Sequence, residues 1–181
     1  THWDHIQGLP FFLPAYSPKN EIRVFGYDGT RTRLREILAG QMETPFFPVS
    51  LKELPGKVAI EELKEMSFQI GSVNVRSKFL NHPGVCVGYR LETNAGSVVY
   101  MPDNEPYEQL DLQLHTRGAE NTGHSYKSPA EERAALVEFV RDADLLILDT
   151  QYTDEEYQSR VGWGHGSVSH AVSPPAGADA Q

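Results

Sequence analysis

Two histidines and an aspartate lie within four residues at the start of the chain, in the sequence Thr1-His2-Trp3-Asp4-His5. Side chains so close together in sequence can converge on metal only from a tight turn at the end of a strand. Imidazole nitrogens and carboxylate oxygens are ligands that suit zinc, manganese or iron. The motif therefore predicts that His2, Asp4 and His5 bind metal, with a surface loop that happens to carry two histidines as the alternative.

The cysteine content bears on the kind of metal site. Structural zinc sites usually close all four ligand positions with cysteines and histidines, whereas catalytic sites keep one position open. The chain has one cysteine, Cys86, in the apolar run Val85-Cys86-Val87, which indicates a buried strand residue and not a nucleophile. An open, catalytic site is therefore the better interpretation. With no intrachain disulfide available, a reducing compartment is expected.

Size and charge limit the class of protein. The 181 residues suit one domain, and the 39% hydrophobic and 23% charged content is ordinary for a soluble globular protein. The formal net charge of −9 argues against nucleic acid as a partner, because phosphate neutralisation needs basic patches. A small phosphodiester remains compatible, since metal ions supply positive charge locally. The sequence has no bilayer-spanning run and no signal peptide, so a cytoplasmic protein without a membrane partner is expected; a homodimer is left open.

The hydrophobic pattern predicts an α+β fold of packed sheets with outer helices. Strands are expected over residues 21–27, 57–63, 66–80, 84–93, 97–101 and 144–149, and helices over 32–42 and 129–142. Gly71-Ser72 interrupts the third strand run and indicates a turn or bulge. Ser128 and Glu131 have the spacing of a capping box at the start of the second helix. The apolar strand 144–149 is expected to be buried.

The domain organisation is expected to be simple. One domain should cover residues 1–173, with the polar, irregular segment 104–127 as a surface excursion within it. That excursion is a candidate lid or subunit contact. Residues 174–181 are rich in proline, alanine and glycine and are expected to form a loose tail.

The opening residues 1–9 resemble the motif His-x-His-x-Asp-His of the metallo-β-lactamase superfamily. The resemblance is greatest to the branch that includes phosphoribosyl cyclic phosphodiesterases and the tRNA 3′-end processing ribonuclease. It implies an αββα sandwich, with two mixed sheets flanked by helices, and two divalent metal ions. Zinc is the first choice, with manganese or iron as alternatives. The first histidine of the motif would precede Thr1, so a partial domain, truncated at both ends, is expected.

Two later segments continue the resemblance. Residues 81–84, Asn-His-Pro-Gly, resemble the family's next ligand segment and imply that His82 binds metal; a turn histidine is the alternative. Residues 100–103, Tyr-Met-Pro-Asp, resemble the strand end whose aspartate bridges two metals, which implies that role for Asp103. Pro102 departs from the glycine or threonine more usual before this aspartate, and Pro-Asp-Asn is also an ordinary turn sequence.

A third pair of segments resembles the ribonuclease branch in particular. Residues 148–152, Leu-Asp-Thr-Gln-Tyr, resemble its acid-bearing strand end, and residues 162–167, Gly-Trp-Gly-His-Gly-Ser, its His-Ser/Thr motif. The resemblance implies that Asp149 orients His165, and that His165 donates a proton to the leaving oxygen instead of binding metal. The terminal ligand histidine would then lie beyond Gln181. Alternatively, Asp149 only ends a strand and His165 is a glycine-flanked loop residue.

The activity implied is hydrolysis by a hydroxide held between two metal ions. Asp4 would bind one metal and orient the hydroxide or accept its proton. The Asp149/His165 pair favours a small or cyclic phosphodiester as substrate, because an alkoxide leaving group benefits from a nearby acid. A lactone, thioester or β-lactam hydrolase on the same fold remains open, as does a regulatory domain that has lost activity. Because the first and last ligands of the pattern would lie outside the chain, the sequence leaves open whether the chain alone is active.

Overall fold

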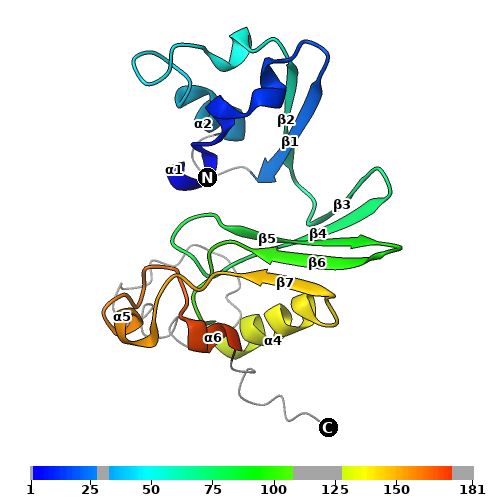
Figure 1. Ribbon diagram of the computed structural model, residues 1–181. Coiled ribbons are helices and arrows are strands. Elements are labelled where there is room, and N and C mark those ends of the chain that lie inside the picture. Colours follow the sequence, from blue (N-terminus) through cyan, green and yellow to red (C-terminus); the bar gives the residue numbers. More distant parts are fainter. Residues whose placement is uncertain (1, 28–32, 108–127, 173–181) are drawn as a thin grey trace. The chain divides into compact units, whose positions relative to one another are not determined.

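The computed structural model describes residues 2–27, 33–107 and 128–172 (Figure 1). The chain divides into two compact units, Thr1–Glu65 and Met66–Gln181, and each contains one sheet. The expected α+β class with two sheets and accompanying helices is therefore confirmed. The single domain over residues 1–173 stays a prediction.

Parts of the predicted organisation cannot be compared with the structure. Residues 108–127 of the expected excursion and the tail 174–181 lie outside the described residues. Within the parts that are described, none of the helices has the length and apolar character needed to cross a bilayer. The cytoplasmic location stays a prediction.

The first unit is built on two parallel strands. β1 (Glu21–Tyr27) and β2 (Lys57–Leu63) begin and end where the hydrophobic pattern predicts. The helices are α1 (Trp3–Ile6), α2 (Leu34–Gly40) and the short 3₁₀ turns Leu9–Phe11, Leu13–Tyr16 and Leu51–Glu53. A small core of Ala15, Met42, Leu51 and Leu54 lies among these elements.

The second unit contains a five-stranded sheet in the order β3-β4-β5-β6-β7. Its strands are β3 (Ser67–Ile70), β4 (Val73–Phe79), β5 (Val87–Thr93), β6 (Gly96–Met101) and β7 (Leu145–Leu148). The first four pair antiparallel in chain order, and β7 returns to pair parallel with β6. The interruption predicted at Gly71 is the turn of the β3–β4 hairpin, where Gly71 has a φ of 59°.

Helix α4 (Pro129–Val140) begins as its sequence predicts. The Ser128 hydroxyl accepts from the Glu131 N–H at 3.3 Å, and the Ser128 N–H donates to the Glu131 carboxylate at 2.6 Å. This reciprocal pair satisfies two backbone donors that a helix start leaves without intrahelical partners. The helix ends at Val140, two residues earlier than expected, and Asp142 beyond it adopts a φ of 54°.

Helix α4 packs on β6 and β7 and forms the core of the second unit (Figure 1). Val99 is fully buried and Met101 is 2% exposed, and both lie against Leu80 and Phe139. Leu136, Val140 and Leu148 complete the contact. Asp103 and Asp149, two of the predicted site residues, follow the β6–β7 pair that this core supports.

Buried Arg90 ties the sheet to the C-terminus of α4. Its Nη1 donates to the carbonyls of Phe139 at 3.1 Å and Arg141 at 2.7 Å. Its Nε donates to the Glu92 carboxylate at 2.7 Å, which balances the charge. A cation at this end of a helix satisfies carbonyls that lack intrahelical partners and stabilises the helix dipole.

The expectation that the strand 144–149 is buried is wrong for most of its length. Leu145, Leu146 and Ile147 are 51%, 42% and 45% exposed. The reason is that β7 is an edge strand, paired on one side only among the described residues. An apolar run of four residues shows that a strand is favoured, but not how many neighbours the strand has.

Phe139 should be the most sensitive apolar contact of this core. We expect Phe139→Ala to lower the free energy of unfolding by about 3–5 kcal/mol, because it removes a buried ring and leaves a cavity. Phe79→Ala is the matched control, since Phe79 is 51% exposed on β4 and its loss should cost roughly 1 kcal/mol or less. Urea unfolding of both variants measures the difference, and equal losses would contradict the assigned core.

Asp144 should make stability depend on pH. Its carboxylate accepts from the Ser97 N–H at 2.7 Å and the Ser97 hydroxyl at 3.1 Å, and these bonds lower the Asp144 pKa. A folded-state pKa below the unfolded value of 3.8 stabilises the fold above that pH, and the contribution is lost as the pH falls through the lowered pKa. Asp144→Asn should therefore flatten the loss of stability on acidification, measured by urea unfolding from about pH 6 to about pH 3.

Asp142→Asn is the control for this titration, because it removes a carboxyl two residues away without touching Ser97. It should leave the dependence of stability on pH as in the wild type. An identical slope in Asp144→Asn and the wild type would show that the Ser97 bonds do not stabilise the ionised carboxylate.

Candidate active site

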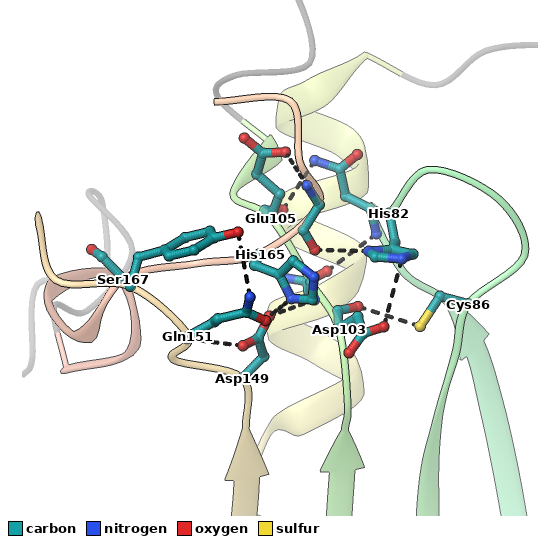
Figure 2. Close-up of polar contacts among 12 residues, drawn as sticks. His82, Cys86, Asp103, Glu105, Asp149, Gln151, His165 and Ser167 are labelled. Atoms are coloured by element: carbon teal, nitrogen blue, oxygen red, sulfur yellow. Dashed lines mark hydrogen bonds and ion pairs between the residues drawn. The ribbon is translucent and has the colours of Figure 1, made fainter. Parts of the chain in front are cut away.

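The parallel pairing of β6 and β7 brings two carboxylates to one edge of the sheet. Met101 pairs with Leu148 at the ends of the strands, and the Asp149 N–H donates to the Met101 carbonyl at 3.2 Å. Asp103 follows β6 and Asp149 follows β7, so both side chains lie at the C-terminal end of the pair (Figure 2). Two segments 46 residues apart in sequence thus contribute to one site.

His82 joins this edge from the loop between β4 and β5. Its Nδ1 lies 2.9 Å from the Gly164 carbonyl oxygen, and its Nε2 lies 3.5 Å from Oδ2 of Asp103. Because a carbonyl oxygen can only accept, Nδ1 must carry the proton, and in the neutral ring Nε2 then presents its lone pair toward Asp103. A lone pair facing a carboxylate is the arrangement that a shared cation would stabilise. His82 and Asp103 therefore fit the predicted role of metal ligands.

Asp149 and His165 form a second pair beside the first. Nδ1 of His165 lies 2.8 Å from Oδ2 of Asp149, and the imidazole is 17% exposed. The Asp149 carboxylate also accepts from the backbone N–H groups of Asn104 at 3.3 Å and Gln151 at 3.0 Å. The bond to Asp149 requires a proton on Nδ1, so Nε2 is the nitrogen of His165 that remains for chemistry. This is the orientation expected for an acid–base histidine held by a carboxylate.

The two pairs are adjacent. The rings of His82 and His165 meet edge to face, with centroids 5.2 Å apart. Asp103, Asp149 and His165 each offer one ligand atom within 4.8 Å of the others. By spacing alone, His165 could thus bind a metal as well as act as an acid. The proton-donor role of His165 stays a prediction, and the two roles have different consequences for activity.

The residues of the opening motif lie in the first unit. His2 immediately precedes α1, and Asp4 and His5 lie within that single helical turn. Nε2 of His5 is 3.6 Å from Oδ2 of Asp4, and the Asp4 side chain is 71% exposed. In the second unit, the structure brings four predicted site residues together, namely His82, Asp103, Asp149 and His165. The ligand roles of His2, Asp4 and His5 stay predictions.

Glu105 is a buried site residue that the sequence analysis missed. It is 1% exposed, although it belongs to the polar segment 104–127 that was expected at the surface. Its carboxylate accepts from Tyr157 and from the backbone of Gly162 and Gly164, next to His165. No local pattern marks it, because the donors to its carboxylate come from more than 50 residues away. Only its position two residues after Asp103 gave a hint.

Cys86 lies beside the site without the properties of a nucleophile. Its Sγ donates to the Asp103 carbonyl at 3.4 Å. Burial raises the pKa of the Cys86 thiol, which favours the neutral and unreactive form. Cys86 is half-buried and lies one residue before β5, so the expected buried strand position is met only in part.

The architecture and this site define a metallo-β-lactamase type of fold. The metallo-beta-lactamase fold protein YhfI from Bacillus subtilis superposes with a TM-score of 0.50 at 17% identity, over 92% of this chain and 51% of that one. The short form of human tRNase Z superposes with a TM-score of 0.59 at 20% identity, over 94% and 62%. Identities this low establish the fold alone.

The sequence model described as "Beta-lactamase superfamily domain" matches residues 1–120, and the chain belongs to this family. The expected superfamily is therefore confirmed. Among curated proteins, ribonuclease Z of Thermoplasma acidophilum is 23% identical over 94% of this chain and 61% of its own length. Ribonuclease Z of Haloferax volcanii is 23% identical over 98% and 62%. The chain thus spans about three-fifths of the length of these relatives, and the predicted ribonuclease branch is the one they represent.

The prediction that nucleic acid is not a partner is contradicted by these relatives, whose names are those of ribonucleases. The prediction failed because it was based on the net charge of the chain. A formal charge of −9 is a sum over the whole chain, whereas phosphate recognition depends on the charges around the site. Bound cations can reverse the local sign of the charge, and they do so for RNA as well as for a small phosphodiester.

Asp103 should be required for metal binding by this chain. We expect Asp103→Asn to weaken the binding of Zn²⁺ or Mn²⁺ at least about tenfold, because an amide oxygen lacks the charge of the carboxylate. Asp144→Asn is the matched control at the opposite end of β7 and should bind as the wild type does. Isothermal titration calorimetry measures both dissociation constants. Equal affinities in the wild type and Asp103→Asn would exclude Asp103 as a ligand.

Proposed function

We propose that this chain supplies active-site residues of a metal-dependent phosphodiesterase that cleaves RNA. The observation that carries the proposal is the Asp149–His165 pair, held at 2.8 Å beside His82 and Asp103. Phosphodiester cleavage requires a proton for the departing alkoxide oxygen, and an oriented imidazole can provide it. We propose RNA as the substrate in place of a small or cyclic phosphodiester, because the relatives are named as ribonucleases.

The side chains at the sheet edge fit divalent cations. Imidazole nitrogen from His82 and carboxylate oxygen from Asp103 suit Zn²⁺, with Mn²⁺ or Fe²⁺ as alternatives. Such cations, when bound, lower the pKa of a coordinated water and offset charge on the phosphoryl oxygens. His2, Asp4 and His5 are proposed as further ligands, on the strength of the motif that they form. Asp4 would also orient the attacking hydroxide or accept its proton.

His165 would act as the general acid. In the imidazolium form, Nδ1 donates to Asp149, and Nε2 carries the proton that is transferred to the leaving oxygen as its bond to phosphorus breaks. The Asp149 carboxylate stabilises the imidazolium and holds the ring orientation. The Asn104 and Gln151 N–H groups fix the carboxylate in turn. After the transfer, neutral His165 regains a proton from solvent.

RNA as the substrate class has support beyond the names of the relatives. Trp163 is 57% exposed and lies two residues before His165, and the Arg160 guanidinium lies over its ring, 4.6 Å from the centroid. Exposed aromatic rings and guanidinium groups are the side chains on which unpaired RNA bases stack. These two groups would contact a nucleotide near the scissile bond.

Two substrates with different leaving groups test the role of His165. Bis(p-nitrophenyl) phosphate releases p-nitrophenolate, which departs without protonation, whereas an RNA hairpin with a 3′ extension releases an alkoxide. In metal-supplemented protein, we expect His165→Ala to lower kcat on the RNA by roughly 10²–10⁴-fold, with a much smaller loss on the aryl ester. Steady-state kinetics on both substrates gives the ratio. His170→Ala is the matched control and should retain both activities.

The remaining outcomes identify the alternatives. Equal losses on both substrates, together with weakened metal binding, would show that His165 is a ligand and not the acid. Turnover of a lactone, thioester or β-lactam without phosphodiester cleavage would show that the protein is a hydrolase of a different class. A folded wild-type protein that binds metal yet cleaves none of these substrates would contradict the proposed function of this chain.

A further inference from the structure

We propose that Glu105 is a positioning residue that holds the Gly162–Gly164 turn and thereby sets the orientation of both His82 and His165. The inference builds on the proposed function, because it concerns how the two active-site histidines are placed. Glu105 does not touch the reacting atoms. Its effect would pass through the backbone of a turn that contacts one histidine and precedes the other.

The surroundings of Glu105 are those of a built hydrogen-bond site. The side chain is 1% exposed. Oε1 accepts from the Tyr157 hydroxyl at 2.9 Å and from the Gly162 N–H at 2.7 Å, and Oε2 accepts from the Gly164 N–H at 2.9 Å. Three hydrogen-bond donors on one carboxylate offset the free-energy cost of removing this charged group from water. An acidic side chain would not be needed here if Glu105 only filled apolar space.

Gly164 links Glu105 to His82 through its backbone. Its N–H donates to Glu105, and its carbonyl accepts from Nδ1 of His82 at 2.9 Å. Gly164 has a φ of 89°, and a Cβ at this position would lie 2.2 Å from Nδ1 of His82. The close approach therefore requires glycine, and the glycine needs a partner that fixes its backbone. Glu105 is that partner.

The backbone of Glu105 holds the other side of His82. Its N–H donates to the Asn81 carbonyl at 2.8 Å, and the Asn81 side-chain amide donates to the Glu105 carbonyl at 3.0 Å. Glu105 thus contacts the residue before His82 as well as the residue before His165. One buried residue couples the loop after β4 to the turn after α5 (Asp154–Gln158).

The consequence concerns the imidazole tautomer. With the Gly164 carbonyl in place, His82 keeps its proton on Nδ1 and its lone pair on Nε2, toward Asp103. A displaced turn would remove the acceptor, and the ring could exchange its proton between the two nitrogens. The same displacement would move His165 relative to Asp149. A residue that only filled space would have neither effect.

Nitrogen-15 NMR of the histidine rings tests the proposal on metal-free protein without substrate. We expect Glu105→Gln to move the ring signals of His82 and His165, because the amide oxygen can accept from only one of the two glycine N–H groups and the NH₂ cannot accept from the other. The dissociation constant of Zn²⁺ should rise roughly 10–100-fold, as is typical when a residue that orients a ligand is replaced. Tyr157→Phe is the control that removes one donor and spares the Gly164 bond, so it should leave the His82 signals in place.

Unchanged ring signals and unchanged metal affinity in folded Glu105→Gln protein would overturn the proposal. If that variant does not fold, hydrogen exchange of the wild type decides instead. The Gly162 and Gly164 amides should exchange slowly because they donate to a buried carboxylate, and fast exchange would overturn the assignment. These measurements use no turnover. Shifted ring signals in a protein without phosphodiesterase activity would keep the positioning role and reject the proposed function.

Discussion

The parallel pairing of β6 with β7 is the constraint on which the second unit depends. Parallel strands need a long crossover, and here it includes α4, which packs on the same two strands. Because both strands run in one direction, their C-terminal ends meet at one edge. Asp103 and Asp149 follow those ends directly. The pairing that buries Val99 and Met101 is therefore also the pairing that creates the candidate site.

The site extends from this edge through hydrogen bonds to loop backbone and not through apolar packing. Carbonyl and N–H groups of residues 162–164 hold His82 and Glu105. Bonds of this kind are strong when they are shielded from water and are directional, so they can fix a tautomer as well as a position. Apolar contacts stabilise the sheet beneath, whereas the loops above it owe their geometry to these polar pairs.

The net charge of the whole chain does not describe the charges around the candidate site. The formal charge of −9 is a sum over the whole chain, and part of it comes from carboxylates that are removed from water, namely Glu105 and Asp149, whose side chain is 6% exposed and paired with His165. Buried acids bound to N–H donors or to cations do not repel a polyanion as solvated acids would. The proposal of RNA in place of a small phosphodiester is compatible with this distinction and is motivated by the relatives named as ribonucleases.

Local sequence patterns were enough to predict most helices and strands and the chemical types of most site residues. Strand bounds at 21–27 and 57–63, the hairpin at Gly71 and the capping box at Ser128 all follow from interactions between near neighbours. The resemblance then singled out His82, Asp103, Asp149 and His165, four residues that the structure brings together. Only tertiary structure decided that β7 is a half-exposed edge and that Glu105 is buried against Gly164. Those features depend on partners distant in the chain, and no local periodicity records which distant groups will meet.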